Sequence, residues 1–148
     1  MINNQKALAV HDSELERVFE YVRSQGHSCS LPSEEFNRHA DKHGWDFGND
    51  GEINGRVIDF KSFGLKKGPK SYWWDSNHWR FRNQRRFYPG QITQYFVHKV
   101  GNDPSEYLVA RASSIQKSRF DGGMPWYPAD DVVTLKQFLE YTAAVQAA

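Results

Sequence analysis

The clearest hydrophobic pattern in the chain lies between residues 13 and 25. Apolar residues recur there at the three- and four-residue intervals of one helix face, at Leu15, Val18, Phe19 and Val22. Ser13 followed by Glu16 has the spacing of an N-terminal capping box, and Gly26 stands where helices often end in a left-handed residue. We therefore predict an amphipathic helix over Ser13–Gln25.

Two further segments carry helical signals. Acidic residues follow Ser33 in a first turn, and the pattern predicts a helix from Ser33 to Lys42. Near the C-terminus, Thr134 and Gln137 form a second capping box. The face of this last predicted helix that should be buried consists of Leu135, Phe138, Leu139 and Thr142.

The periodicity changes after residue 44. The short aromatic segment Trp45–Phe47, the Gly-, Asn- and Asp-rich stretch Gly48–Gly55 and the alternating segment Val57–Phe63 together predict a β-hairpin. The following stretch, Gly64–Gly90, shows no clear period, and we make no structural prediction for it.

Two strands are predicted in the second half of the chain. Ile92–Val100 and Glu106–Ala112 are separated by Gly101–Pro104, a strong turn signal, although Gln91–Phe96 could instead begin as a helix. The order helix, helix, hairpin, loop, strands and helix predicts an α/β fold with a mixed sheet flanked by helices. A length of 148 residues fits a single compact domain over residues 1–148.

The composition is that of a folded globular protein, with 39% hydrophobic and 15% aromatic residues. No apolar run approaches the roughly 18 residues that span a bilayer, and Met1–Val10 lacks the pattern of a signal peptide. We therefore expect a cytoplasmic protein without a membrane partner. Cys29 is the only cysteine, which excludes an intramolecular disulfide and metal centres built from several thiolates.

The net charge of +1 hides a very uneven distribution. Between Lys61 and Gly90, eight basic residues accompany one acid, a net charge of +7, so the rest of the chain carries −6. Aromatic residues are interleaved with these cations, a composition that suits a groove for phosphates and unpaired bases. The expected nucleic-acid contacts are Lys66, Lys67, Lys70, Arg82, Arg85 and Arg86. Alternatively, the aromatic residues belong to the core and the arginines cover a helix face.

Asp59 and Lys61 are the strongest candidates for chemistry. At positions i and i+2 of one strand they share a face, while Ile58 and Phe60 point to the opposite side, where we expect the core. Hydrolysis of a phosphodiester with Mg²⁺ needs carboxylates that hold the ion. An adjacent ammonium group can orient the attacking water or offset developing charge. The sequence therefore predicts a catalytic metal centre on this strand.

A second carboxylate must come from a neighbouring segment. Asp46 is the first choice, because the predicted hairpin would return it beside Asp59, and Glu52 and Asp50 are the second and third. We expect Asp46, Asp59 and Lys61 to be catalytic, with Glu52 as a further metal ligand. Two carboxylates of the first predicted helix are either additional ligands or part of its solvated face: Glu16 and Glu20.

These residues resemble the PD-(D/E)xK nuclease superfamily, whose core motif is an acid, a hairpin and then acid-x-Lys. Here the motif would be Asp46 followed by Asp59–Lys61, in wording most similar to RecB-type exonucleases. Those enzymes also carry Gln-x-x-x-Tyr on a helix beside the site, and Gln91 and Tyr95 have that spacing. Trp45 stands where the motif has proline, and the segment around Tyr95 is rich in strand-favouring residues.

The resemblance implies a nuclease that hydrolyses phosphodiester bonds of DNA with Mg²⁺, for which Mn²⁺ can substitute. It also implies a restriction endonuclease-like core, a homodimer as in many such nucleases, and a phage, mobile-element or repair setting. Two other classes stay open. One is a non-catalytic nucleic-acid-binding or anti-defence module that uses the basic tract of residues 66–88. The other is a protein-interaction domain in which the tryptophans form an apolar hot spot.

Overall fold

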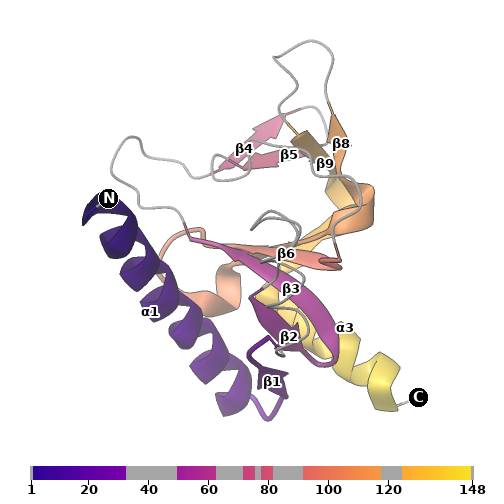
Figure 1. Ribbon diagram of the computed structural model, residues 1–148. Helices are drawn as coiled ribbons and strands as arrows, with labels where there is room; N and C mark the ends of the chain where they lie inside the picture. Colours follow the sequence, from indigo (N-terminus) through magenta and orange to yellow (C-terminus); the bar gives the residue numbers. More distant parts are fainter. Residues whose placement is uncertain are drawn as a thin grey trace.

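Six strands form a mixed β-sheet at the centre of the molecule (Figure 1). Their order is β1-β2-β3-β6-β7-β10, in which β3 and β6 run parallel and the other neighbouring pairs are antiparallel. They span Cys29–Ser30, Gly51–Ile53, Arg56–Lys61, Tyr95–His98, Leu108–Arg111 and Val132–Thr134. This computed structural model describes residues 2–32, 50–62, 72–75, 78–81, 92–117 and 125–147.

A second, four-stranded antiparallel sheet packs over one face of the first, in the order β4-β5-β9-β8 (Figure 1). Its strands span Tyr72–Asp75, His78–Phe81, Pro125–Pro128 and Gln116–Lys117. Phe81 and Tyr127 of this sheet form a buried cluster with Phe96 and Ala110 of the first. The segment without a predicted structure thus contributes the hairpin β4-β5, and Phe81, an aromatic residue of the basic tract, belongs to the core.

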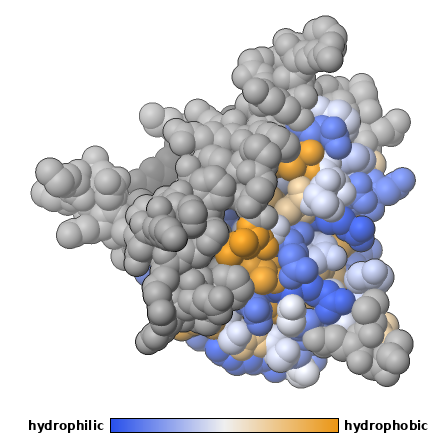
Figure 2. Space-filling view, turned by 45° about the vertical axis from the view of Figure 1, so that its right-hand side comes forward, coloured by the Kyte–Doolittle hydropathy of each residue, from blue (hydrophilic) through white to orange (hydrophobic). Residues whose placement is uncertain are grey.

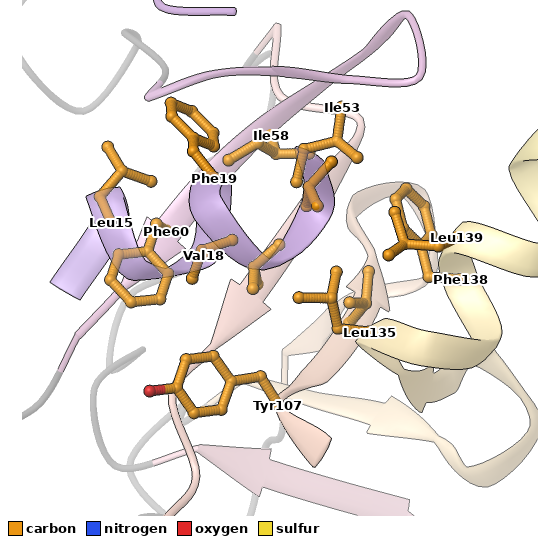
Figure 3. Packing of buried hydrophobic residues seen from close by; sticks show 13 residues of the cluster. Leu15, Val18, Phe19, Ile53, Ile58, Phe60, Tyr107, Leu135, Phe138 and Leu139 are labelled. Atoms are coloured by element: carbon orange, nitrogen blue, oxygen red, sulfur yellow. The ribbon is translucent and has the colours of Figure 1, made fainter. Parts of the chain in front are cut away.

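Two α-helices flank the opposite face of the six-stranded sheet (Figure 1). They are α1, Ile2–Ser24, and α3, Leu135–Ala147, and 3₁₀ turns lie at Pro104–Glu106, Ala112–Ser114 and Ala129–Asp131. Side chains of both helices and of β2, β3, β6 and β7 form one buried cluster (Figure 3). The predicted α/β fold with a mixed sheet and flanking helices is therefore confirmed.

The first helix begins earlier than the sequence indicated. Ser13 was predicted as its N-cap, but α1 starts at Ile2 and runs through Ser13, so that prediction is wrong. The preceding residues, Gln-Lys-Ala-Leu-Ala-Val, are mostly good helix formers, which lets the helix continue. Its predicted end is confirmed: Gly26 has a φ of 82°, and the N–H groups of Gly26 and His27 donate to helix carbonyls at 2.9 and 3.1 Å.

The predicted hairpin exists, but its turn is much shorter than expected. Asn54 and Gly55 join β2 to β3 with φ angles of 50° and 79°, the left-handed pair of a two-residue type I′ turn. The partner strand of β3 therefore begins at Gly51. Trp45–Phe47 and Ser33–Lys42, predicted as a strand and a helix, lie outside the described residues.

Two predictions for the second half of the chain are confirmed. β6 and β7 pair as antiparallel neighbours around the predicted turn. At the start of α3, the Gln137 N–H donates to Thr134 Oγ1 at 3.1 Å, and the Thr134 N–H donates to Gln137 Oε1 at 2.9 Å. The predicted face of this helix is buried, at Leu135, Phe138, Leu139 and Thr142. Within the described ranges, no helix has the length and apolar character needed to span a membrane.

Candidate active site

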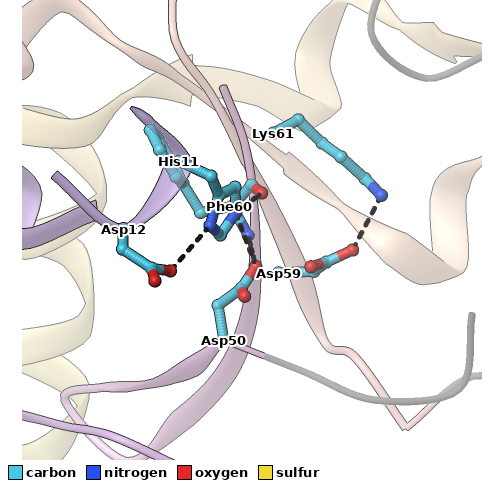
Figure 4. Close-up of polar contacts among 6 residues, drawn as sticks. All are labelled: His11, Asp12, Asp50, Asp59, Phe60 and Lys61. Atoms are coloured by element: carbon cyan, nitrogen blue, oxygen red, sulfur yellow. Dashed lines mark hydrogen bonds and ion pairs between the residues drawn. The ribbon is translucent and has the colours of Figure 1, made fainter. Parts of the chain in front are cut away.

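Asp59 and Lys61 lie on the face of β3 that turns away from the helices (Figure 4). The alternate residues, Ile58 and Phe60, are buried in the cluster that includes α1. Lys61 Nζ is 3.0 Å from Asp59 Oδ2, and the two side chains are 25% and 16% exposed. The predicted pair of a carboxylate and an ammonium group on one strand face is therefore present, and both side chains are largely buried.

The second carboxylate of the site is Asp50, which immediately precedes β2. Its N–H donates to the carbonyl oxygen of Ile58 at 2.9 Å, and its Oδ2 accepts a hydrogen bond from the N–H of Phe60 at 2.6 Å. These bonds reach the residues on either side of Asp59 and hold Asp50 beside it (Figure 4). Each of the two carboxyl groups shifts the pKa of the other.

Asp50 was only the third choice among the predicted partners of Asp59. Asp46, the first choice, lies outside the described residues. Glu52, the second, pairs in register with Val57 and makes no described contact with Asp59. Because the turn has only two residues, the position opposite Asp59 falls on the residue just before β2. Among the described carboxylates, the partner of Asp59 is therefore Asp50.

Several other candidates lie away from this site. Glu16 is exposed on α1 and pairs with Arg23 at 3.5 Å, and Glu20 is exposed as well, as on the solvated face of a helix. Tyr95 begins β6 and packs on Phe138 with ring centroids 4.8 Å apart, on the helix-covered face, so its assignment to the site is wrong. The remaining candidates lie outside the described residues: Gln91, Lys66, Lys67, Lys70, Arg82, Arg85 and Arg86.

His11 of α1 belongs to the site, although it was not among the predicted residues. Its Nε2 donates to the carbonyl oxygen of Phe60 at 2.9 Å and lies 3.5 Å from Asp50 Oδ2 (Figure 4). A signal for it exists in the sequence, because His11 precedes Leu15 by four residues and so shares its helix face. Because the helix was predicted to start at Ser13, His11 lay outside it and was not predicted as a site residue.

The three acid–base groups of the site have different protonation preferences. Burial and the hydrogen bond with Asp50 raise the pKa of Asp59 from 3.8 to about 7, against the effect of Lys61. Burial favours neutral Asp50, but hydrogen bonds with His11 and Asp59 outweigh it and lower the pKa of Asp50. The hydrogen bond with Asp50 raises the pKa of His11 from 6.5 to about 9, against desolvation. At neutral pH, Asp50 is ionised, His11 is protonated and Asp59 is near its midpoint.

Lys61 lies between this acidic pair and the parallel strand β6. It pairs in register with His98, and its Nζ is 5.7 Å from the centroid of the Phe96 ring. His98 is fully buried and its ring stacks on Phe81 with centroids 3.7 Å apart. Burial and the nearby charge of Lys61 hold the pKa of His98 well below its usual value. His98 is therefore neutral, and Lys61 is the cation next to Asp59.

The donor atoms of the site suit a hard divalent cation. Asp50 and Asp59 offer carboxylate oxygens, and Mg²⁺ is commonly bound through one or two carboxylates together with water and substrate phosphate. After burial, the neighbouring Asp50 contributes to the raised pKa of Asp59, and a cation beside the two carboxyl groups would relieve their repulsion. Among the described residues, no group of three or more His, Cys, Asp or Glu side chains could hold a metal ion. The described residues therefore offer two carboxylates beside an ammonium group, and the remaining ligands of such an ion would have to come from water and the substrate.

We expect His11 to make the free energy of unfolding depend on pH. Because its pKa is raised by folding, protonated His11 stabilises the protein below pH 6.5, and this contribution is lost as the pH rises through about 9. His11→Gln should therefore be less stable than wild type by about 3 kcal/mol at pH 6. The difference should shrink strongly by pH 10. Urea unfolding at pH 6, 8 and 10 measures it, and a difference that does not change with pH would contradict this role.

The chain matches no protein-family model, no curated protein and no solved structure. The chemistry of the site must therefore be argued from its own residues. Those residues come from three segments of the chain: His11 from α1, Asp50 from the start of the hairpin, and Asp59 and Lys61 from β3. Asp59 and Lys61 lie toward the C-terminal end of β3, and His11 reaches this end of the strand from α1, through the carbonyl oxygen of Phe60.

Proposed function

We propose that this chain is a Mg²⁺-dependent nuclease that hydrolyses phosphodiester bonds of DNA. The observation that carries the proposal is the adjacent pair of carboxyl groups, Asp50 and Asp59, with Lys61 Nζ 3.0 Å from Asp59 Oδ2. Carboxylates that can hold a metal ion, with an ammonium group beside them, suit metal-assisted hydrolysis of a phosphodiester. The strongly basic tract between Lys61 and Gly90 supports a polyanionic substrate.

The order of the site residues along the chain supports a relationship to the PD-(D/E)xK superfamily. An acid, a hairpin and acid-x-Lys follow one another as Asp50, β2-β3 and Asp59–Lys61, so that Asp50 takes the place first assigned to Asp46. The mixed sheet with helices on one face is compatible with a restriction endonuclease-like core. We include that core in the proposal.

In the proposed mechanism, Asp50 and Asp59 would hold Mg²⁺ through their carboxylate oxygens. When bound there, such an ion would polarise the phosphate and lower the pKa of the attacking water. Asp59 has a pKa of about 7, so it releases its proton readily near neutral pH when a cation takes the proton's place. The Phe60 N–H and His11 keep Asp50 ionised and oriented before any ion arrives.

Lys61 supplies a positively charged group beside the two carboxylates. Its ammonium group lies beside Asp59, and its side chain keeps 25% exposure, through which an attacking water or a phosphate oxygen would reach it. There it donates a hydrogen bond that orients the water or offsets the charge developing on the phosphate. The neutral ring of His98 in the next strand does not compete for this role.

The test is incubation of the purified protein with supercoiled, linear and single-stranded DNA, and with RNA, in Mg²⁺, Mn²⁺ or EDTA. We expect DNA to be cut in either metal ion and to stay intact in EDTA. Cleavage of supercoiled DNA would assign an endonuclease, and cleavage of only the linear forms would assign an exonuclease. DNA that is retarded but intact in every lane would overturn the proposal in favour of a non-catalytic binding module, whose affinity falls with salt and does not depend on Mg²⁺.

A further inference from the structure

A pocket of about 360 Å³ opens on the helix-covered side of the six-stranded sheet. Val109 and Phe138 contribute its buried lining, and Tyr95 and Tyr141 add two aromatic rings. Tyr95 pairs in register with the buried Ile58, so it lies on the face opposite the Asp50–Asp59 pair. The pocket is therefore separate from the candidate active site.

Large apolar side chains come to the surface at this pocket. Most described residues on the face shown in Figure 2 are hydrophilic. Among the described residues, the exposed large hydrophobic side chains are Leu31, Val133 and Tyr141. Two of these three line the pocket: Tyr141 is 55% exposed and Val133 is 36% exposed. Apolar surface that gathers around a hollow, rather than being scattered singly, is typical of a binding site.

The rim of the pocket is charged and has an acidic excess. Arg111, Asp130 and Asp131 line it. Within the described part of the chain, none of these three side chains forms an ion pair or a hydrogen bond. Two carboxylates against one guanidinium favour a cationic group on the ligand and oppose the phosphates of a nucleic acid.

The edge strand β10, next to the pocket, cannot pair with an additional strand through the usual backbone hydrogen bonds. β10 is the outermost strand, and a partner strand would need its outward N–H groups as donors. The Val132 N–H already donates to the carbonyl oxygen of Ala129, and the Thr134 N–H donates to Gln137 Oε1 at 2.9 Å. A partner at this edge must therefore be held by side chains in the pocket.

We propose that this pocket docks a segment of a partner protein that carries a large apolar side chain next to a lysine or arginine. The apolar side chain enters between Tyr95, Val133 and Tyr141, and the neighbouring cation pairs with Asp130 and Asp131. The volume suits one bulky side chain, and the acidic rim selects a basic neighbour. Because the pocket faces away from Asp59, docking leaves the proposed nuclease site open, and the inference does not depend on that function.

The test uses nuclear magnetic resonance of the full chain with two short peptides that differ in one charge. N-acetyl-Trp-Lys-amide should shift the backbone signals of Val133 and Tyr141 in a saturable way. The dissociation constant should lie in the millimolar range expected for binding through a single side chain. N-acetyl-Trp-Glu-amide should bind at least about tenfold more weakly, because its carboxylate meets the acidic rim. Asp130→Asn/Asp131→Asn should remove this preference, whereas Glu16→Gln/Glu20→Gln, with the same loss of charge on α1, should keep it.

Each alternative occupant gives a different result. Absence of a saturable shift, or equal affinity for the two peptides, would overturn the proposal. Stronger shifts with oligo-deoxythymidine would identify a nucleic-acid site instead. Shifts of the same signals on raising the protein concentration, without peptide, would identify a second copy of this chain as the occupant. None of these results depends on whether the protein cleaves DNA, so failure here and failure of the proposed function can be told apart.

Discussion

Replacing Asp59 with asparagine is expected to abolish Mg²⁺-dependent DNA cleavage and, at the same time, to stabilise the protein above neutral pH. The loss of a metal-binding carboxylate should lower the cleavage rate by about three orders of magnitude, equivalent to roughly 4 kcal/mol of barrier. Asp50→Asn should lower the rate as strongly, since the two carboxylates act as one site.

The gain in stability follows from the pKa of Asp59, which folding raises from 3.8 to about 7. The folded state therefore retains a proton that the unfolded state loses, and wild-type stability falls as the pH rises from about 4 through 7. Asparagine resembles the protonated acid and does not titrate. The variant and the wild type should be about equally stable below pH 4 and differ by a few kcal/mol above pH 7.

Urea unfolding at pH 4, 6 and 8, combined with the cleavage assay, tests both parts of this prediction. Asp130→Asn is the matched control, because this carboxyl group is exposed and lies at the pocket on the opposite face. It should change neither the cleavage rate nor the pH dependence. An Asp59→Asn protein that cleaves DNA at the wild-type rate would eliminate the proposed metal centre. One that is less stable than wild type at pH 8 would show that Asp59 is needed in its ionised form for folding.

Gly51→Ala is expected to cost at least about 3 kcal/mol of stability. Gly51 has a φ of 145°, and a Cβ atom there would overlap the carbonyl oxygen of Ser30 and lie 3.0 Å from Phe19 Cζ. The carbonyl belongs to β1, which pairs with β2, so relief of the overlap requires the two strands to separate. Because Asp50 precedes Gly51, the same displacement should weaken cleavage.

Gly26→Ala is the control that distinguishes the effect of this steric overlap from the effect of replacing any glycine that has a positive φ. Gly26 also has a positive φ, 82°, but no atom lies within 4 Å of a Cβ built there. Its replacement should cost only about 1 kcal/mol, the strain of a left-handed residue with a side chain. Urea unfolding of both variants gives the comparison, and equal losses would mean that β1 does not approach β2 as closely as the structure has it.

Short-range patterns determined much of this fold. The alternation of Ile58 and Phe60 with Asp59 and Lys61 placed the first pair in the core and the second on the opposite face of the strand, and the structure confirms it. The end of α1 and the cap of α3 are also as predicted. In each case the residues involved lie within about four positions of one another, where backbone geometry alone decides which groups meet.

The start of α1 could not be predicted from local signals alone. A capping box at Ser13 is only one of the ways to satisfy the first N–H groups of a helix, and the helix-forming residues before it extend α1 to Ile2. This extension places His11 on the buried face of the helix, above β3. One boundary thus decided whether a residue belonged to a loop or to the site.

The composition of the active site was decided by tertiary structure. The carboxylate beside Asp59 is set by the length of the hairpin loop, which favours Asp50 once Asn54 and Gly55 form a two-residue turn. The contact of His11 with Phe60 joins residues 49 positions apart and exists only because α1 packs on the sheet. The sequence by itself determined which strand carries the acid and the lysine. Which groups surround them, and hence which of them holds a proton at neutral pH, depends on contacts that form only when the core is assembled.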